Sequence, residues 1–402
     1  MKIETKAFKT NECAIMLTMP LCKNEITMNA LIPQVLRSGC ETYKTQYEIG
    51  KELEKMYGAS LNCATEMRGD YYIMKFYVEV INEKYLPVKE KITQEAFDLL
   101  LNVIFHPYVE NGGFKKEYVD REKSNLKKII ESRQDNKASY AYGRCIEEMF
   151  KNEPYGVYSY GKISELEKID EINLFQHYKK IIQECRIDTY VVGENTDNLS
   201  IPSFEKKNIQ AQKNEHEIQK EPRIINEELD VTQGKLLLGL DTRSDNKFAT
   251  VMYNTILGGG ANSKLFQNVR EKEHLAYSAS SRYIKRKNAI IISTGIELSN
   301  YDKAISVIKK QLEDMKNGKI TDSEIESARK LIVSSMKEIP ESQDALILFD
   351  FDQRLFAENY KLEEYIKNIE SVTKEQIIDV ANNISINTIY YLRDRKKVIV
   401  WN

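Results

Sequence analysis

Histidine is scarce in this chain, and its scarcity limits the metal chemistry that a short motif could supply. The 402 residues include four histidines, and the nearest two, His177 and His216, are 39 positions apart. A helical zinc motif such as HxxEH needs two histidines about one turn apart, so that both imidazoles lie on one face of the helix. The sequence therefore excludes a two-histidine zinc helix anywhere in the chain.

Closely spaced cysteines are missing as well. The six cysteines form no C-x-x-C pair. A zinc knuckle or a redox motif would need such a pair, and disulfide frameworks are typical of short secreted chains. We therefore expect free thiols, as in a reducing compartment.

Long apolar runs and an excess of one charge are also lacking. No window approaches the ~20 apolar residues of a membrane span, and the first six residues have no apolar segment of the signal-peptide type. The 59 Lys and Arg residues nearly balance the 61 Asp and Glu residues, so no overall positive field favours nucleic acid or an anionic membrane. We expect a cytoplasmic protein that binds neither.

The chain contains two regions of similar organisation. Residues 1–194 and 223–402 are each predicted to contain strands, several amphipathic helices and a closing strand, and the polar stretch 195–222 predicts a linker. The predicted strand at 71–80 corresponds to the one at 289–298. This pattern predicts an α+β fold of two duplicated domains, each an antiparallel-rich sheet covered by helices.

Three local expectations concern helices near the candidate sites. Residues 29–38 predict a buried helix with Pro33 confined to its first turn, where a missing N–H costs nothing. Residues 83–105 predict one long amphipathic helix, and residues 262–272 predict a helix that follows a glycine turn.

A motif in the second region carries a family resemblance. Residues 257–278 read LGGGANSKLFQNVREKEHLAYS, which resembles the C-terminal domain of the M16 (pitrilysin, insulinase and mitochondrial processing peptidase) family. The first region agrees, with VLRSG at 35–39, YGA at 57–59 and FHP at 105–107. The resemblance covers the whole chain and implies two M16-type domains, of the fold shared with LuxS.

The first region departs from the family pattern where active members carry the HxxEH motif. The corresponding window reads ALIPQ, so Ala30 and Gln34 replace the two histidine ligands and Pro33 replaces the glutamate base. The family's third ligand, a glutamate on a later helix, falls near Asp120. Catalytic zinc needs three protein ligands, an open position and a base. The resemblance therefore implies no metal in this chain and no peptide hydrolysis by the chain alone.

The second region keeps the other half of the family's active site. Active members share an arginine and a tyrosine seven positions apart, which reach the zinc site from the second domain. Here they would be Arg270 and Tyr277. A phenol can donate to the oxyanion that forms on the scissile carbonyl, and a guanidinium can hold a neighbouring peptide carbonyl. His274, between them, has no nearby histidine and is assigned no role.

The glycine turn has two interpretations. The resemblance implies that Gly258, Gly259 and Gly260 contact the peptide substrate, whereas a turn that ends one helix before the next is the structural alternative. The turn lacks the Lys-Ser/Thr of a Walker motif and the GxGxxG spacing, so nucleotide binding is not favoured.

Together these features predict a non-catalytic subunit of a heterodimeric M16 zinc metallopeptidase. An HxxEH-containing partner would hold the zinc, while this chain would form half of a peptide chamber and supply Arg270 and Tyr277. Removal of a leader peptide is one task of this kind. The alternatives are a catalytically silent pseudopeptidase that acts as a scaffold or binds peptides, and a self-sufficient peptidase with unusual ligands.

Overall fold

The computed structural model forms two compact units, each of which combines segments from both halves of the sequence. It describes residues 1–87, 90–196, 199–205, 207–211 and 221–395. Unit 1 consists of Met1–Ser132, Val157–Asn214 and Ile339–Glu358, and unit 2 consists of Arg133–Gly156, Glu215–Glu338 and Asn359–Asn402. The predicted division of the chain at 195–222 is therefore incomplete. Arg133–Gly156 comes from the first half of the sequence but belongs to unit 2, and Ile339–Glu358 comes from the second half but belongs to unit 1. Residues 197–198, 206 and 212–220 of the predicted linker lie outside the described residues.

Each unit contains a five-stranded sheet. In unit 1 the strand order is β1 (Lys2–Glu4), β7 (Arg186–Gly193), β2 (Thr10–Pro20), β4 (Tyr71–Ile81), β3 (Ser60–Arg68). In unit 2 it is β8 (Arg223–Leu229), β12 (Ile384–Asp394), β9 (Gly234–Thr242), β11 (Ala289–Ile296), β10 (Ala276–Ile284). A short hairpin, β5 (Val109–Glu110) and β6 (Gly113–Phe114), completes the described strands of unit 1.

The two sheets have the same topology. In each, the first strand pairs in parallel with the last, and all other neighbours are antiparallel. Strand β4 occupies the same position as β11, as the sequence correspondence of 71–80 with 289–298 predicts. The predicted α+β fold of two similar, antiparallel-rich domains is confirmed.

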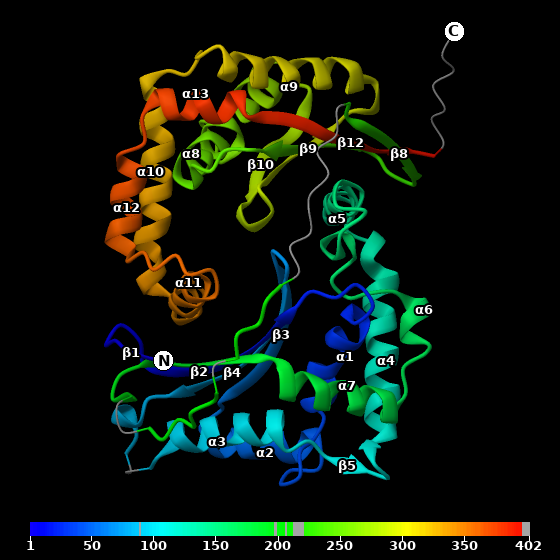
Figure 1. Cartoon of the computed structure of the whole chain (residues 1–402), viewed down its shortest axis with the longest axis vertical. Coiled ribbons are helices and arrows are strands. Elements are labelled where there is room, and N and C mark those ends of the chain that lie inside the picture. Colours follow the sequence, from blue (N-terminus) through cyan, green and yellow to red (C-terminus); the bar gives the residue numbers. More distant parts are fainter. Residues whose placement is uncertain (88–89, 197–198, 206, 212–220, 396–402) are drawn as a thin grey trace. The chain divides into compact units, whose positions relative to one another are not determined.

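Helices cover both sheets (Figure 1). Unit 1 contains α1 (Ile26–Leu36), α2 (Gln46–Lys55), α3 (Ile92–Phe105), α4 (Lys116–Glu131), α6 (Ile163–Leu166), α7 (Glu171–Glu184) and α11 (Gln343–Leu355). Unit 2 contains α5 (Lys137–Met149), α8 (Lys247–Gly258), α9 (Tyr301–Lys316), α10 (Asp322–Glu338), α12 (Leu362–Glu370) and α13 (Lys374–Asn382). None of the helices in the described part of the chain is both long enough and apolar enough to cross a membrane.

Helix α5 comes from the first half of the sequence but packs in unit 2. Its residues Tyr140, Cys145 and Met149 are buried in one cluster with residues of the unit 2 sheet, among them Leu237 and Tyr390. A polar contact fixes the helix on the same sheet. The carboxylate of Glu227 on β8 accepts hydrogen bonds from the Tyr140 hydroxyl, from Arg144 Nε at 3.0 Å and from the Tyr390 hydroxyl at 2.9 Å.

Helix α11 makes the reciprocal exchange and packs in unit 1. Ile347 and Phe351 are fully buried against Met16, Ile73 and Tyr190 of the unit 1 sheet.

Polar contacts then fix the position of α11 on the strands. The Gln343 amide donates to the backbone carbonyls of Thr10 and Val192, both at 2.9 Å. Buried Lys75 on β4 forms ion pairs with Glu12, at 3.1 Å, and with Asp344 of the helix. A buried ammonium needs such partners, because removing a charge from water is costly.

Two of the helix predictions need correction. Pro33 lies in the interior of α1, not in its first turn, and the carbonyl of Asn29 therefore lacks the usual helical N–H partner. Burial of the flanking residues compensates, and the helix ends at Leu36. The single helix expected at 83–105 begins only at Ile92, because Leu86 precedes a proline and is extended.

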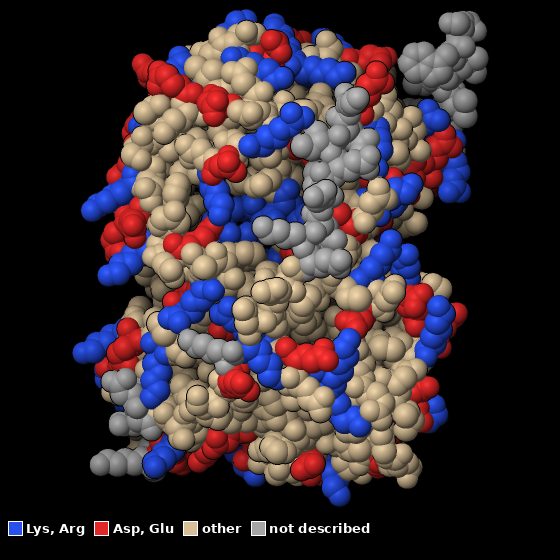
Figure 2. Space-filling view, in the orientation of Figure 1, with Lys and Arg blue, Asp and Glu red and all other residues tan. Residues whose placement is uncertain are grey.

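The surface carries both charges. On the face drawn in Figure 2, Lys and Arg side chains lie interspersed with Asp and Glu side chains among the other residues, which cover most of the view. This mixture agrees with the near-balanced composition of the chain.

The packing of α11 predicts a large loss of stability for Phe351→Ala. The substitution removes a fully buried ring and should lower the free energy of unfolding of unit 1 by about 3–5 kcal/mol. Phe349→Ala is the matched control, because Phe349 is on the same helix but is only partly buried and lies outside the cluster. Urea denaturation measures both. Equal losses for the two variants would contradict the packing described here.

Candidate functional site

The window that the resemblance aligns with the family's zinc motif lies on α1, and most side chains of this helix are buried. Ala30 and Pro33 are buried, with 3% of Ala30 exposed, while Gln34 is half-buried. The first two provide no ligand atom, and an amide such as that of Gln34 is a poor zinc ligand.

Around Gln34 the structure places a polar network that contains two guanidinium groups. Ser38 donates to the Gln34 carbonyl at 3.1 Å and accepts from Arg121 on α4 at 2.6 Å. Arg37 approaches the thiol of Cys63 on β3 at 3.9 Å, and burial raises the pKa of that thiol. A divalent cation placed here would be repelled by both guanidinium groups.

The carboxylates of α4 do not form a metal site. Asp120, the position predicted for the third ligand, is exposed and pairs with Lys116 at 3.3 Å. Glu122, which the sequence analysis did not single out, approaches the residues that follow α1, with the Ser38 hydroxyl 3.4 Å from its carboxylate. Its side chain is 12% exposed and accepts from Arg121 at 2.8 Å and from Asn125 at 3.0 Å. Among the described residues no three His, Cys, Asp or Glu side chains are grouped to hold a metal. The residues present do not fit zinc.

Arg270 lies on the helical segment Phe266–Lys272, which has π-helical hydrogen bonding where a regular helix was expected. Its guanidinium lies over the Phe266 ring, 4.5 Å from the ring centre, and its Nε is 3.6 Å from Glu271. The side chain is 42% exposed. The guanidinium therefore remains partly accessible from the solvent.

Tyr277 lies at the start of β10, where the pairing with β11 shifts register between Ala276 and Ser278. The side chain is 56% exposed, and its hydroxyl donates to Glu297 at 2.7 Å. This hydrogen bond raises the pKa of Tyr277, because a carboxylate acceptor favours the protonated phenol. The phenol is thus kept in its donor form, but its proton is already engaged.

The segment between these two residues is a tight turn. His274 is exposed and adopts a left-handed conformation, with φ of 53°, as is common where a helix ends. Leu275 donates from its backbone N–H to the Val269 carbonyl at 3.0 Å. Arg270 and Tyr277 each interact with a different acidic residue, and the hydrogen bonds and ion pairs of the described residues do not join them to one another.

The three glycines have different surroundings. A Cβ on Gly258 would lie 2.4 Å from the backbone nitrogen of Ser281, and one on Gly259 would lie 2.6 Å from Cα of Thr255. Close packing at the end of α8 therefore explains these two glycines without a ligand. A Cβ on Gly260 would meet only the end of the Leu331 side chain, at 3.0 Å.

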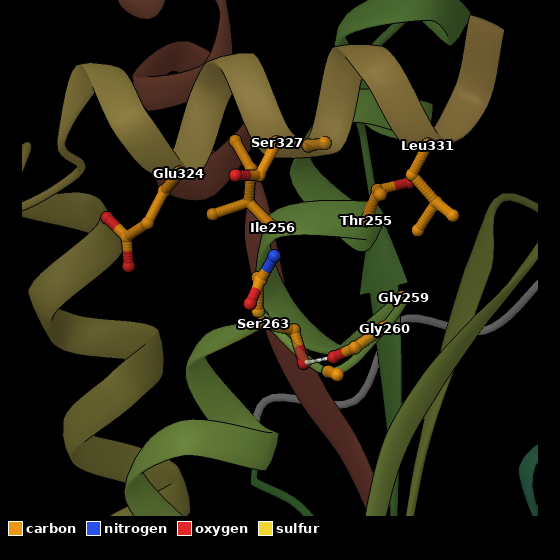
Figure 3. A pocket seen from close by; sticks show the side chains of 11 residues that line it. Thr255, Ile256, Gly259, Gly260, Ser263, Glu324, Ser327 and Leu331 are labelled. Carbon is orange, nitrogen blue, oxygen red and sulfur yellow. Dashed lines mark hydrogen bonds between the residues drawn. The ribbon is translucent and has the colours of Figure 1, made fainter. Parts of the chain in front are cut away.

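A pocket of about 280 Å³ borders the glycine turn, between α8 and α10 (Figure 3). It is lined by Thr255, Ile256, Gly259, Gly260, Ala261, Asn262, Ser263, Glu324, Ser327, Ala328 and Leu331. The glycine motif thus provides one wall of a cavity, which the sequence pattern alone did not indicate.

The Tyr277–Glu297 contact leads to a prediction about pH. Glu297→Gln removes the carboxylate acceptor and should lower the pKa of Tyr277 toward its ordinary value of about 10. Glu271→Gln is the matched control, because Glu271 is also exposed but interacts with Arg270. Carbon-13 NMR of labelled tyrosine, assigned with Tyr277→Phe, measures both. An unchanged pKa in Glu297→Gln would show that the hydrogen bond does not persist in solution.

The chain is similar in sequence to known proteins of one family. Residues 168–332 match the family model described as "Peptidase M16 inactive domain". The chain is 32% identical over 402 residues to the "Probable inactive metalloprotease YmfF" of Bacillus subtilis, which covers 97% of this chain and 94% of that protein.

Solved structures share the fold along nearly the whole chain. A conserved protein from Enterococcus faecalis V583 superposes with a TM-score of 0.90 at 27% identity, covering 99% of this chain and 96% of that one. A peptidase M16 inactive domain from Pseudomonas fluorescens superposes with a TM-score of 0.77 at 16% identity, covering 98% and 96%. Sequence and fold agree, and the chain belongs to the M16 peptidase family, among its inactive metalloproteases.

Proposed function

We propose that this chain is the non-catalytic subunit of a heterodimeric M16 zinc metallopeptidase. In this proposal an HxxEH-containing M16 partner holds the zinc, and this chain forms half of the peptide chamber and supplies Arg270 and Tyr277. The partner's zinc supplies the activated water for peptide hydrolysis. Processing of a peptide, such as removal of a leader, is the reaction class that such an assembly would carry out.

One observation supports the proposal: the window that the resemblance aligns with the zinc motif has no ligand residues, while the arginine and tyrosine that it aligns with the rest of the site are present. The α1 window offers Ala30, Pro33 and Gln34, whereas unit 2 presents an exposed guanidinium and an exposed phenol. Exposure of large polar side chains costs little and leaves them able to reach a second protein.

Each retained side chain suits a separate task. Arg270 offers a delocalised charge and several N–H donors, which suit a peptide carbonyl. Tyr277 offers one O–H donor, which suits an oxyanion that forms in the transition state. To act in this way Tyr277 must leave Glu297, so the substrate oxygen competes with that carboxylate.

The second candidate is a catalytically silent protein that binds peptides or acts as a scaffold. It is favoured by the contacts that Arg270 and Tyr277 make within this chain. Glu271 and Phe266 already engage Arg270, and Glu297 already accepts from Tyr277. Both side chains would then stabilise the surface of unit 2 and have no part in catalysis.

Activity of the reconstituted pair separates these candidates. The chain is mixed with an HxxEH-containing M16 chain of similar length from the same genome, with zinc and an unfolded peptide. Tyr277→Phe should lower kcat by about 100-fold with little change in KM, because it removes a donor used in the transition state. Arg270→Ala should lower kcat/KM and raise KM.

Tyr283→Phe is the matched control for this experiment. Tyr283 lies on the same strand, and its hydroxyl contacts Asn288 at 3.4 Å, so its loss should leave activity unchanged. If Tyr277→Phe and Arg270→Ala both keep full activity, the role in catalysis is wrong and the silent protein is supported.

Zinc content tests the other half of the proposal. After equilibration with zinc and gel filtration, the isolated chain should carry far less than one zinc per molecule, since α1 lacks ligands. Elemental analysis measures this, with the HxxEH-containing partner as positive control. One tightly held zinc per chain, together with hydrolysis by the isolated chain, would support the self-sufficient peptidase instead.

A further inference from the structure

One face of the unit 2 sheet is covered by α5 over part of its width and is open beside strand β10. Helices α8, α9 and α13 pack on the other face (Figure 1). On the α5 face, the buried cluster includes Leu237 of β9, and in the described part of the chain β10 takes part in this cluster through Ile284 at its end. Further along β10, Ser278, Ser280 and Arg282 are exposed.

The strand pairing shows which residues share this open area. Ser278 of β10 lies opposite Gly295 of β11, and Gly295 lies opposite Lys235 of β9. Opposite residues in neighbouring antiparallel strands point to the same face, and so do residues two apart along one strand. Lys235 is therefore on the same face as Leu237, and so is Arg282. From Ser278 to Arg282, the three rows of opposite residues on β9, β10 and β11 contain two cations and no carboxylate.

Lys235 carries a half-buried ammonium for which the described residues provide no carboxylate partner. Its Nζ donates to the side-chain oxygen of Gln233 at 3.3 Å. Burial lowers the pKa of Lys235, and in the described part of the chain no acidic neighbour offsets this effect. A charge withdrawn from water without a counter-charge is unfavourable. Contact with an anion would therefore stabilise this ammonium.

Gly295 leaves a space in which the Lys235 ammonium and the Ser278 hydroxyl meet. A Cβ on Gly295 would lie 3.2 Å from Ser278 Oγ and 3.4 Å from Lys235 Nζ. The two donor groups thus converge on one point above the glycine. The φ of Gly295 is outside the left-handed region, so the backbone conformation does not require glycine here. A glycine inside a strand often marks a place that a ligand approaches closely.

We propose that Lys235 and Ser278 bind the side-chain carboxylate of an aspartate or glutamate in an extended peptide, above Gly295. The ammonium and the hydroxyl can each donate a hydrogen bond to one carboxylate, and bonds to a charged acceptor are the stronger kind. Arg282 adds a second positive charge on the same face. Both proposed donors are side chains, whereas capture of a chain terminus uses a nest of backbone groups. The site therefore favours an acidic side chain over a C-terminal carboxylate.

The proposal rests on the proposed function for its ligand class, peptide, and adds a substrate preference to it. Ser278 directly follows Tyr277, and Gly295 is two residues before Glu297, which accepts from the Tyr277 hydroxyl. The carboxylate site therefore adjoins the phenol that is proposed to act on the scissile carbonyl. A peptide that reaches this phenol would present a neighbouring side chain to Lys235, and an acidic residue there is preferred.

Amide NMR of the whole isolated chain tests the proposal with matched peptides. Titration with acetyl-AAEAA-amide should shift the amide signals of Ser278 and Gly295, and added salt should weaken this binding. The peptide acetyl-AAQAA-amide differs only in the charge and should bind about tenfold more weakly or less. Absence of shifts with the glutamate peptide, or equal affinities for the two, would overturn the proposal.

A third peptide separates the two sources of a carboxylate. The peptide acetyl-AAAAA, with a free C-terminus, carries its carboxylate at the chain end and should bind more weakly than acetyl-AAEAA-amide. Affinity equal to or above that of the glutamate peptide would assign the site to chain termini and overturn the preference for an acidic side chain.

Variants of unit 2 complete the test. Lys235→Met removes the charge but keeps a long apolar stem, and should weaken binding of the glutamate peptide at least tenfold. Gly295→Ala places a methyl group between the two donors and should also weaken binding. Lys309→Met is the matched control, because it removes the same charge from an exposed position on α9, which packs on the other face of the sheet. Binding that survives Lys235→Met, or that falls equally in Lys309→Met, would also overturn the proposal.

These measurements need neither the partner nor zinc. Loss of peptidase activity in the reconstituted pair and loss of peptide binding by the isolated chain are therefore separate results. The first bears on the proposed function and the second on the carboxylate site.

Discussion

In the described part of the chain, each sheet has an apolar face that is covered by a helix from the other half of the sequence. Phe351 of α11 is buried on the unit 1 sheet, and Met149 of α5 is buried on the unit 2 sheet. Burial of such side chains is the main favourable term in folding. The polar contacts of buried Gln343 and half-buried Glu227 fix where each helix lies, because an amide or carboxylate withdrawn from water without partners is costly. The other helices of each unit pack around a sheet whose second face is covered by α5 or α11.

Local pattern predicted most of the elements and the internal repeat, because amphipathic period and turn residues act within a short window. It failed for two reasons. At Leu86 and Pro87 a local signal was overlooked, since a proline keeps the residue before it extended. At Pro33 a tertiary effect decided, since burial of the surrounding side chains outweighs the missing N–H. The exchange of α5 and α11 was not predicted, since amphipathicity tells which face is buried but not which sheet covers it.

The candidate site was also predicted only in part from the sequence. The 257–278 motif located Arg270, Tyr277 and the glycine turn by sequence alone, because the spacing of these residues is a family pattern. It did not reveal that Glu297 accepts a hydrogen bond from the phenol, that Glu122 lies beside Ser38, or that α10 lines a pocket beside Gly260. These contacts join residues 20 or more positions apart, and no local pattern specifies them.

The equal topology of the two sheets has a consequence for how such a chain could arise. Helices α5 and α11 follow α4 and α10, at equivalent places in the two halves of the repeat. Each half provides the helix that covers the sheet of the other half, and two separate copies that exchanged this helix would form a domain-swapped dimer. When the two copies are joined in one chain, the exchange of helices takes place within a single molecule. Its equilibrium then no longer depends on protein concentration.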